Sequence, residues 1–244
     1  MRGFMVASGN FFFRYRNFLF PVVFLAFAGA LMPGLPGAAG ERDVVMDIAG
    51  AAIALAGQSL RFAVIGFAYV KRGGKNKRVY ADTLVQEGFF AHARNPLYVG
   101  NILVLLGLIV IHGSPWFLVF GSAFFLFAYL AITAAEEEFL GKKFGEQYAE
   151  YCRRVPRFFL RMAGLRASLQ GMSFDWRRVI RKEYGSTFTW VVAALALIVW
   201  ERYRRGGTDS IAGIEAFVIA GFAVVLTAYV AARILKKTGH LGHD

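Results

Sequence analysis

Three consecutive glutamates, Glu136, Glu137 and Glu138, stand in the stretch AAEEEFL, at the point where a long apolar run ends. Carboxylates at the C-terminal end of a helix are unfavourable because they face the negative end of the helix dipole, and neighbouring like charges repel one another. A positively charged partner would offset this electrostatic cost. The partner could be a basic side chain from the surrounding loops or a bound cation, and both interpretations stay open.

The stretch FFAHARNPLYVGN predicts a helix that begins at Asn95 and Pro96. The residue before a proline is disfavoured in the helical region, whereas proline itself is tolerated in the first turn. The unpaired N–H groups of such a helix start, together with Arg94, favour the binding of a carboxylate or a phosphate. In a simpler interpretation, His92 and Arg94 anchor the chain at the membrane interface and Gly100 only allows close helix packing.

An aromatic stripe lies in the stretch FGEQYAEYCRRVP. Phe144, Tyr148 and Tyr151 are spaced by four and three residues, as on one face of a helix, and Pro156 would close that helix. Such stripes serve packing more often than they contact a cofactor. The same stretch carries Arg154, which could orient a phosphate or a carboxylate of a substrate.

One arginine, Arg61, stands within or near the end of an apolar run that is long enough to be a membrane helix, with Gln58 and Ser59 close by in the sequence. An ionisable residue at that depth is expensive, and it must face protein, water or a ligand. Arg61 is therefore a candidate site residue.

The composition indicates an all-α integral membrane protein. The chain has 244 residues, of which 57% are hydrophobic, and its mean hydropathy is +0.48; a soluble domain of this length normally carries more charge. The net charge of +12 comes from short blocks of Lys and Arg between apolar runs, which favours membrane orientation over nucleic-acid binding. The single cysteine, Cys152, excludes a disulfide framework and a CxxC metal site.

Six apolar runs approach the length of about 20 residues that a helix needs to cross a bilayer. They extend from about Asn17 to Met32, Val44 to Tyr69, Leu97 to His112, Trp116 to Ala135, Thr187 to Trp200 and Ile211 to Leu235. The third run is short and turns at HGSP directly into the fourth, which predicts a short helix hairpin. The basic blocks fall on one side if both termini are cytoplasmic, except for the block in ERYRRGGTDS. The N-terminal stretch MRGFMVASGN is not expected to be a signal peptide.

The order of these motifs resembles the superfamily of isoprenylcysteine carboxyl methyltransferases and phospholipid (phosphatidylethanolamine) N-methyltransferases. The shared features are an LR pair that ends at Arg61, the stretch NPLYVG, an EExxL motif that begins at Glu136, and FGxxYxxYxxxVP ending at Pro156. The resemblance covers about residues 57–156. The family's common RHP histidine is Asn95 here, and NPLYVG with HGSP is closer to the phosphatidylethanolamine branch, which favours a lipid amine as acceptor.

The resemblance implies a membrane methyltransferase with S-adenosylmethionine in a cytoplasmic pocket. Its acceptor would be a lipid amine or an isoprenylcysteine-like carboxylate that enters from the bilayer. The carboxylate of the cofactor would suit Arg94 and the helix start at Pro96, and its ammonium and sulfonium groups would suit Glu136 and Glu137. The residues expected to bind the cofactor are His92, Arg94, Asn95, Pro96, Tyr98, Gly100, Glu136, Glu137, Tyr148 and Tyr151.

Catalytic roles are expected for three residues. Arg154 and Arg61 would orient a phosphate or carboxylate of the substrate, and Glu137 would accept a proton from an amine substrate. Methyl transfer is an in-line displacement that needs alignment and loss of water more than it needs a triad or a metal. No metal site is expected.

The chain is expected to contain four parts. These are an N-terminal transmembrane region (1–56), a cofactor-binding core (57–160), a basic amphipathic segment in the membrane interface (161–186) and a C-terminal helix pair (187–244). The small residues of the last apolar run allow close helix contact, so the chain could form a homodimer.

Two other classes of function fit parts of the pattern. A membrane reductase of the sterol reductase type would bind NADPH, although an acidic cluster has little use beside a polyanionic cofactor. A non-catalytic scaffold would use the basic stretches only to hold anionic headgroups of membrane lipids.

Overall fold

The computed structural model of the protein describes residues 2–31, 33, 41–67, 72–75, 78–81, 83–206, 211 and 213–242. Most of the loop predicted at PGLPGAAG therefore lies outside the described residues. Within them the chain is helical apart from one small β-hairpin, so the prediction of an all-α membrane protein is confirmed.

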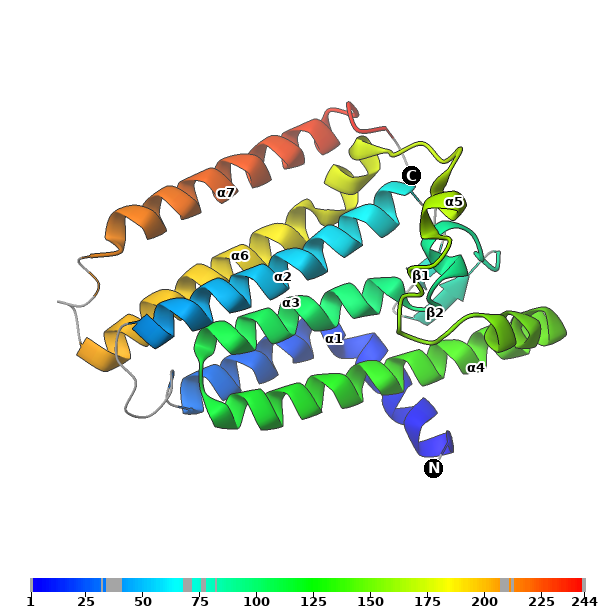
Figure 1. Cartoon of the computed structure of the whole chain (residues 1–244), viewed down its shortest axis with the longest axis horizontal. Helices are drawn as coiled ribbons and strands as arrows, with labels where there is room; N and C mark the ends of the chain where they lie inside the picture. Colours follow the sequence, from blue (N-terminus) through cyan, green and yellow to red (C-terminus); the bar gives the residue numbers. More distant parts are fainter. Residues whose placement is uncertain are drawn as a thin grey trace.

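Five described helices are long and apolar enough to cross a bilayer. They are α1 (Arg2–Ala30), α2 (Glu41–Phe67), α4 (Ser122–Arg154) with the short π-helical turn η2 (Phe117–Gly121) before it, α6 (Trp176–Gly206) and α7 (Glu215–Lys237). The sixth apolar helix, α3 (Pro96–His112), has 17 residues and is shorter than the roughly 20 needed. The helices run lengthwise beside one another, and α7 lies on the outside next to α6 (Figure 1).

Helices α2 and α3 cross at very short range because glycines face each other. A Cβ atom on Gly50 would lie 2.5 Å from the carbonyl oxygen of Gly107, and one on Gly57 would lie 2.6 Å from that of Gly100. No side chain can occupy such a space unless a backbone moves. The two glycine pairs therefore fix how α2 and α3 sit against each other.

Helix α4 continues well past Ala135, where its apolar run was predicted to end. It runs to Arg154 and is interrupted only at Gly145. The φ of Gly145 is 53°, a left-handed conformation that glycine adopts more easily than residues with a side chain. Val155 is extended, as expected for the residue before Pro156. The apolar run and the aromatic stripe thus belong to one long element, which carries Glu136 on its way out of the apolar part.

Aromatic side chains fill the contact between α1 and α4. Phe20 packs edge-on against Phe125 and Tyr129, with ring centroids 5.4 Å apart in both cases, and Phe24 lies 5.1 Å from Phe117. The edge-to-face pairs of Phe20 add to the stabilisation from burial. They fix α1 against α4 beside the site described below.

The smaller elements gather at the end of the bundle where α3 begins and α4 ends (Figure 1). They are the antiparallel hairpin of β1 (Arg72–Lys75) and β2 (Arg78–Ala81), the 3₁₀ turn η1 (Gly88–Ala91) and α5 (Leu165–Leu169). Helix α1 begins and α7 ends at this same end of the bundle.

The basic amphipathic segment predicted over 161–186 is divided in the structure. It contains α5, a break at Gly171 with φ of 82°, and the first turns of α6. Asp175 starts α6, because its Oδ1 accepts a 2.9 Å hydrogen bond from the backbone N–H of Arg178. That bond lowers the pKa of the Asp175 carboxyl. Helix α6 therefore begins earlier than the predicted Thr187.

Candidate active site

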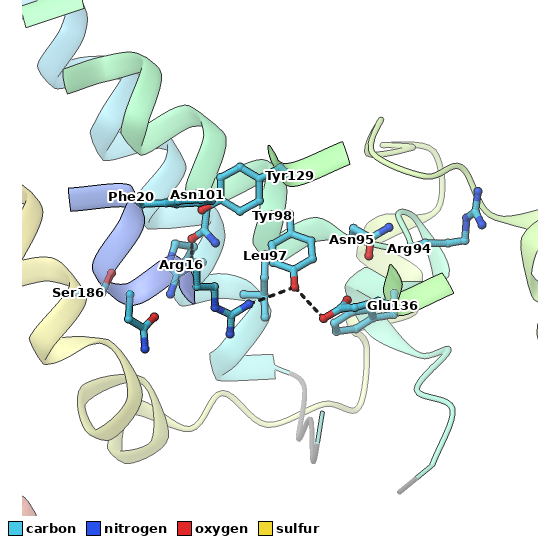
Figure 2. A pocket seen from close by; sticks show the side chains of 13 residues that line it. Arg16, Phe20, Arg94, Asn95, Leu97, Tyr98, Asn101, Tyr129, Glu136 and Ser186 are labelled. Carbon is cyan, nitrogen blue, oxygen red and sulfur yellow. Dashed lines mark hydrogen bonds between the residues drawn. The ribbon is translucent and has the colours of Figure 1, made fainter. Parts of the chain in front are cut away.

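A polar cavity of about 400 Å³ lies at the end of the bundle where α3 begins (Figure 2). We call it the polar cavity. Residues from α1, α2, η1, α3, α4 and α6 line it: Arg16, Asn17, Phe20, Arg61, Phe90, Arg94, Asn95, Leu97, Tyr98, Asn101, Tyr129, Glu136 and Ser186. The structure thus brings five predicted site residues together here, namely Arg61, Arg94, Asn95, Tyr98 and Glu136.

The hydroxyl of Tyr98 connects opposite charges in this cavity. It donates a 2.7 Å hydrogen bond to Oε1 of Glu136 and accepts a longer one, of 3.5 Å, from Nη1 of Arg16 (Figure 2). The side chain of Glu136 is buried, with only 4% of the residue exposed. A carboxylate removed from water is costly unless it is bonded, so Glu136 is a strong attachment point for a cationic or hydrogen-bond-donating ligand.

The predicted start of α3 at Asn95 and Pro96 is confirmed. Asn95 is the N-cap residue and Pro96 the first residue of the helix, as proline's fixed φ favours. The side chain of Asn95 does not cap the helix; its Nδ2 donates to the carbonyl oxygen of Arg157 at 3.2 Å. The backbone N–H of Arg94 donates to the carbonyl oxygen of Pro156 at 2.9 Å. The loop after α4 therefore holds the beginning of α3 in place.

Next to the polar cavity, Glu137 is surrounded by two arginines, a group that we call the ion cluster. Its Oε1 lies 2.9 Å from Nη1 of Arg94 and accepts a 2.9 Å bond from Nε of Arg157, and its Oε2 accepts from Nη2 of Arg157. Hydrogen bonding to Glu137 raises the pKa of Arg157. Arg94 also donates to Sγ of Cys152 at 2.8 Å. Both oxygens of Glu137 are thus engaged by guanidinium groups.

The third glutamate, Glu138, lies on the surface. It pairs with Arg2 at 3.0 Å and with Lys142 at 2.9 Å, and both basic side chains are mostly exposed. The interpretation in which basic side chains of the chain pair with the acidic run holds for Glu137 and Glu138. Glu136 lines the polar cavity.

The aromatic stripe of α4 packs rather than lining the polar cavity. Tyr148 and Tyr151 are buried with Leu140 and Val155, and the hydroxyl of Tyr151 donates a 2.7 Å bond to the carbonyl oxygen of Phe90 in η1. Because Phe90 lines the cavity, Tyr151 supports its wall from behind.

Two further predicted cofactor residues, His92 and Gly100, have structural contacts. The ring of His92 bonds through Nδ1 to the carbonyl oxygen of Arg161 at 2.7 Å and through Nε2 to Oγ of Ser168 at 2.8 Å, which links the chain before α3 to α5. Gly100 allows the close α2–α3 crossing, as in the simpler interpretation of that residue.

Arg154, a predicted catalytic residue, lies at the last turn of α4. Its side chain is 62% exposed and its Nε lies 3.3 Å from Glu150 one turn earlier. Arg154 is not among the residues that line the polar cavity. Tandem basic residues at the end of a helix point in different directions, and here the side chain faces outward.

Arg16, Asn101 and Ser186 line the polar cavity but were not predicted. Arg16 and Ser186 lie outside the stretch 57–156 that carries the family motifs, so only the fold brings them to the site. Asn101 stands one residue after Gly100 on the same helix, and a polar residue within an apolar run was a signal that could have identified it.

Comparison with known proteins supports the predicted resemblance. Residues 48–147 match the sequence model of the family described as phospholipid methyltransferase. Over 82 residues the chain is 39% identical to the cobalt-zinc-cadmium resistance protein CzcN of Cupriavidus metallidurans; the matched stretch is 34% of this chain and 38% of that relative. No solved structure matches. The resemblance to the phospholipid methyltransferase superfamily is thus confirmed for residues 48–147.

The matched segment contains most of the polar cavity. It includes every lining residue from Arg61 to Glu136, whereas α1 contributes three lining residues and α6 contributes Ser186 from outside the segment. Among the residues that the structure describes, no group of three or more His, Cys, Asp or Glu side chains is arranged to hold a metal ion.

Proposed function

We propose that the protein is an integral membrane methyltransferase that uses S-adenosylmethionine and transfers its methyl group to a lipid-embedded acceptor. The observation that carries this proposal is the polar cavity, in which the buried carboxylate of Glu136 lies within the segment that matches the phospholipid methyltransferase family. Five helices of membrane-crossing length support the membrane location.

The residues of the cavity fit the chemistry of this cofactor. The volume of about 400 Å³ is within the range of roughly 300 to 1,000 Å³ for small-molecule pockets. Glu136 would attract an ammonium or sulfonium group, and Arg94 beside the start of α3 would attract a carboxylate. Phe90 and Leu97 offer apolar surface to an adenine ring.

When bound, S-adenosylmethionine supplies an electrophilic methyl group whose bond to sulfur breaks as the bond to the acceptor forms. The chain's own residues would orient the two reactants and exclude water. An amine acceptor must also lose a proton. Glu137 was predicted to accept it, but both of its oxygens bond to arginines. We therefore assign Glu137 to holding Arg94 and Arg157. We assign the proton to Glu136, because its carboxylate lines the polar cavity whereas that of Glu137 does not.

Transfer of a labelled methyl group tests this function. Purified protein in lipid vesicles is incubated with S-adenosylmethionine that carries a tritiated methyl group, and the lipids are then extracted into an organic phase. The proposal predicts label in the lipid phase with the unmodified protein and a strong loss of it with Glu136→Gln. The vesicles are made from the lipids of the membrane in which the protein is produced. Absence of label in the extracted lipids would contradict the proposal.

Alkaline treatment of the labelled lipid distinguishes the two acceptor classes. A methyl ester on an isoprenylcysteine-like carboxylate releases its label as methanol in base, whereas an N-methyl group on a lipid amine is stable. The NPLYVG stretch favours the stable product.

A reductase that binds NADPH is the main alternative. Among the described residues, the polar cavity is lined by one carboxylate, Glu136, and by three arginines, Arg16, Arg61 and Arg94, so its charges alone do not exclude the phosphates of NADPH. A buried carboxylate beside a polyanionic cofactor is unfavourable, and the match of residues 48–147 to the phospholipid methyltransferase family favours the methyltransferase.

A further inference from the structure

Arg61 reaches the polar cavity from α2, and a carboxylate on α6 holds its guanidinium in two places. Nε donates to Oε2 of Glu183 at 2.8 Å and Nη2 donates to Oε1 at 2.6 Å. Nη1 donates to Oδ1 of Asn101 on α3. This two-point arrangement fixes both the position and the plane of the guanidinium.

Glu183 is in turn held by a second layer of side chains. Its own side chain is 3% exposed, and its Oε2 also accepts a 3.0 Å bond from Nε2 of Gln58. Gln58 is fixed from its other side, because its Oε1 accepts a 2.9 Å bond from the indole N–H of Trp190 on α6. The hydrogen-bonded chain therefore runs from α6 to α2 and back to α6.

The close crossing of α2 and α3 leaves room for the stem of Arg61. A Cβ atom on Gly100 would lie 2.6 Å from Cγ of Arg61, so the arginine passes directly over this glycine. Gly100 thus admits the side chain, Asn101 bonds to one of its nitrogens, and Glu183 bonds to the other two. Three helices determine where one guanidinium lies.

Stability alone is a weak reason for such an arrangement. Removing two charges from water costs about as much as their attraction returns, and apolar side chains of similar size often stabilise a buried site as well or better. The arginine of this pair lines the polar cavity, and the bonds to Glu183 and Asn101 leave part of its hydrogen-bonding capacity for a ligand.

We propose that Glu183 is a positioning residue for the transfer reaction: it fixes Arg61 in the cavity so that Arg61 can bind an anionic oxygen of a bound molecule. Helix α6 lies outside the segment that matches the family, and through Glu183 it contributes to a site that this segment mostly forms. This inference rests on the proposed methyltransferase function. Arg61 contacts the bound molecule, and Glu183 acts only through Arg61.

The test compares Glu183→Gln, Glu183→Asp, Arg61→Ala and the double variant Arg61→Ala/Glu183→Gln. Initial rates are measured with tritiated S-adenosylmethionine and vesicles of phosphatidylethanolamine and phosphatidylglycerol, and kcat and KM are determined for both substrates. Glu201→Gln is the matched control, because Glu201 is another buried carboxylate of α6, with 2% of the residue exposed. Thermal unfolding of every variant gives the folded fraction to which rates are normalised.

We expect Glu183→Gln to lower kcat/KM about tenfold or more, the size expected when a charge-assisted hydrogen bond is lost. Glu183→Asp should recover part of that loss, and Glu201→Gln should change the normalised kcat/KM less than about twofold. Because Glu183 acts through Arg61, the double variant should be no slower than Arg61→Ala alone.

Three results would overturn the inference. Glu183→Gln could keep the normalised kcat/KM of the unmodified protein, which would leave Glu183 a structural residue. The double variant could lose the product of the two single losses, which would mean that Glu183 acts independently of Arg61. An unmodified protein that methylates no lipid would count against the proposed function itself, and the inference would fall with it.

Discussion

Glu136 and Glu137 are neighbours on α4, yet they belong to two different regions of the site. Glu136 lines the polar cavity and accepts a hydrogen bond from the neutral hydroxyl of Tyr98, whereas Glu137 lies in the ion cluster between Arg94 and Arg157. A helix rotates each successive residue by about 100 degrees, so adjacent carboxylates face different surroundings. A run of acids is thus one motif in sequence but separate sites in space.

The two regions have different roles, one structural and one in ligand binding. The ion cluster joins α4 to the loop before α3 and to the loop after α4, and it therefore holds the walls of the cavity. The polar cavity carries the buried carboxylate of Glu136, which accepts a hydrogen bond from the hydroxyl of Tyr98. Because this carboxylate lines the cavity, it is the one placed to contact a cationic ligand there.

The largest expected effect comes from Glu136→Gln. Losing a charged hydrogen-bond partner of the cofactor should weaken the binding of S-adenosylhomocysteine by about 1.5 to 3 kcal/mol, or roughly 10- to 100-fold. The thermal stability should change little, because the amide can still accept from Tyr98. Calorimetric titration measures the affinity, and an affinity equal to that of the unmodified protein would remove Glu136 from the site.

Glu137→Gln should reverse this pattern. It leaves Arg94 and Arg157 without a carboxylate, so the free energy of unfolding should fall by about 1 to 3 kcal/mol. Cofactor affinity should fall less than in Glu136→Gln, since Glu137 acts by holding Arg94. Thermal unfolding and titration of the two variants in parallel check the contrast. A loss of affinity in Glu137→Gln as large as that in Glu136→Gln would erase the distinction between the two regions.

Tyr98→Phe removes only the hydroxyl that connects Arg16 and Glu136. The expected cost is about 0.5 to 1.5 kcal/mol in the affinity for S-adenosylhomocysteine, the usual worth of one hydrogen bond. The aromatic ring is kept, and so is its packing against Tyr129, whose ring centroid lies 5.4 Å from that of Tyr98 in the unmodified protein. The loss should disappear in the Glu136→Gln background if the hydroxyl acts by orienting Glu136, and a double-mutant cycle measures this.

Glu138→Gln should have the smallest effect. Its partners Arg2 and Lys142 are mostly exposed, and exposed ion pairs contribute roughly 0 to 1 kcal/mol. We expect unchanged cofactor affinity and a small shift in thermal stability that vanishes in high salt. A loss of cofactor affinity in this variant would indicate that the negative charge of Glu138 attracts the cofactor from outside the polar cavity.

Local rules account for the parts of the fold that the sequence predicted well. The start of α3 followed from the Asn95–Pro96 pair, and the apolar runs located the helices, because both depend on neighbouring residues only. The length of α4 was underestimated. Residues after Ala135 are polar but favour a helix, and hydropathy alone does not distinguish the end of an apolar run from the end of a helix.

The site was harder to predict because much of it is assembled from distant segments. Arg61 was identified from its depth in an apolar run, but its partner Glu183 lies on another helix and belongs to no motif. Arg16 also lines the cavity from a helix, α1, that carries none of the family motifs. Tyr148 and Tyr151 carry the family motif, yet in the structure they support the wall around Phe90 instead of lining the cavity.

Calorimetric titration of the purified, unmodified protein with S-adenosylhomocysteine, alongside the same titration with NADPH, tests the central claim most directly. The account predicts saturable binding of S-adenosylhomocysteine and no heat of binding with NADPH. Binding of NADPH alone would contradict the methyltransferase and favour a reductase, and binding of neither would leave the polar cavity without the cofactor that its charges fit.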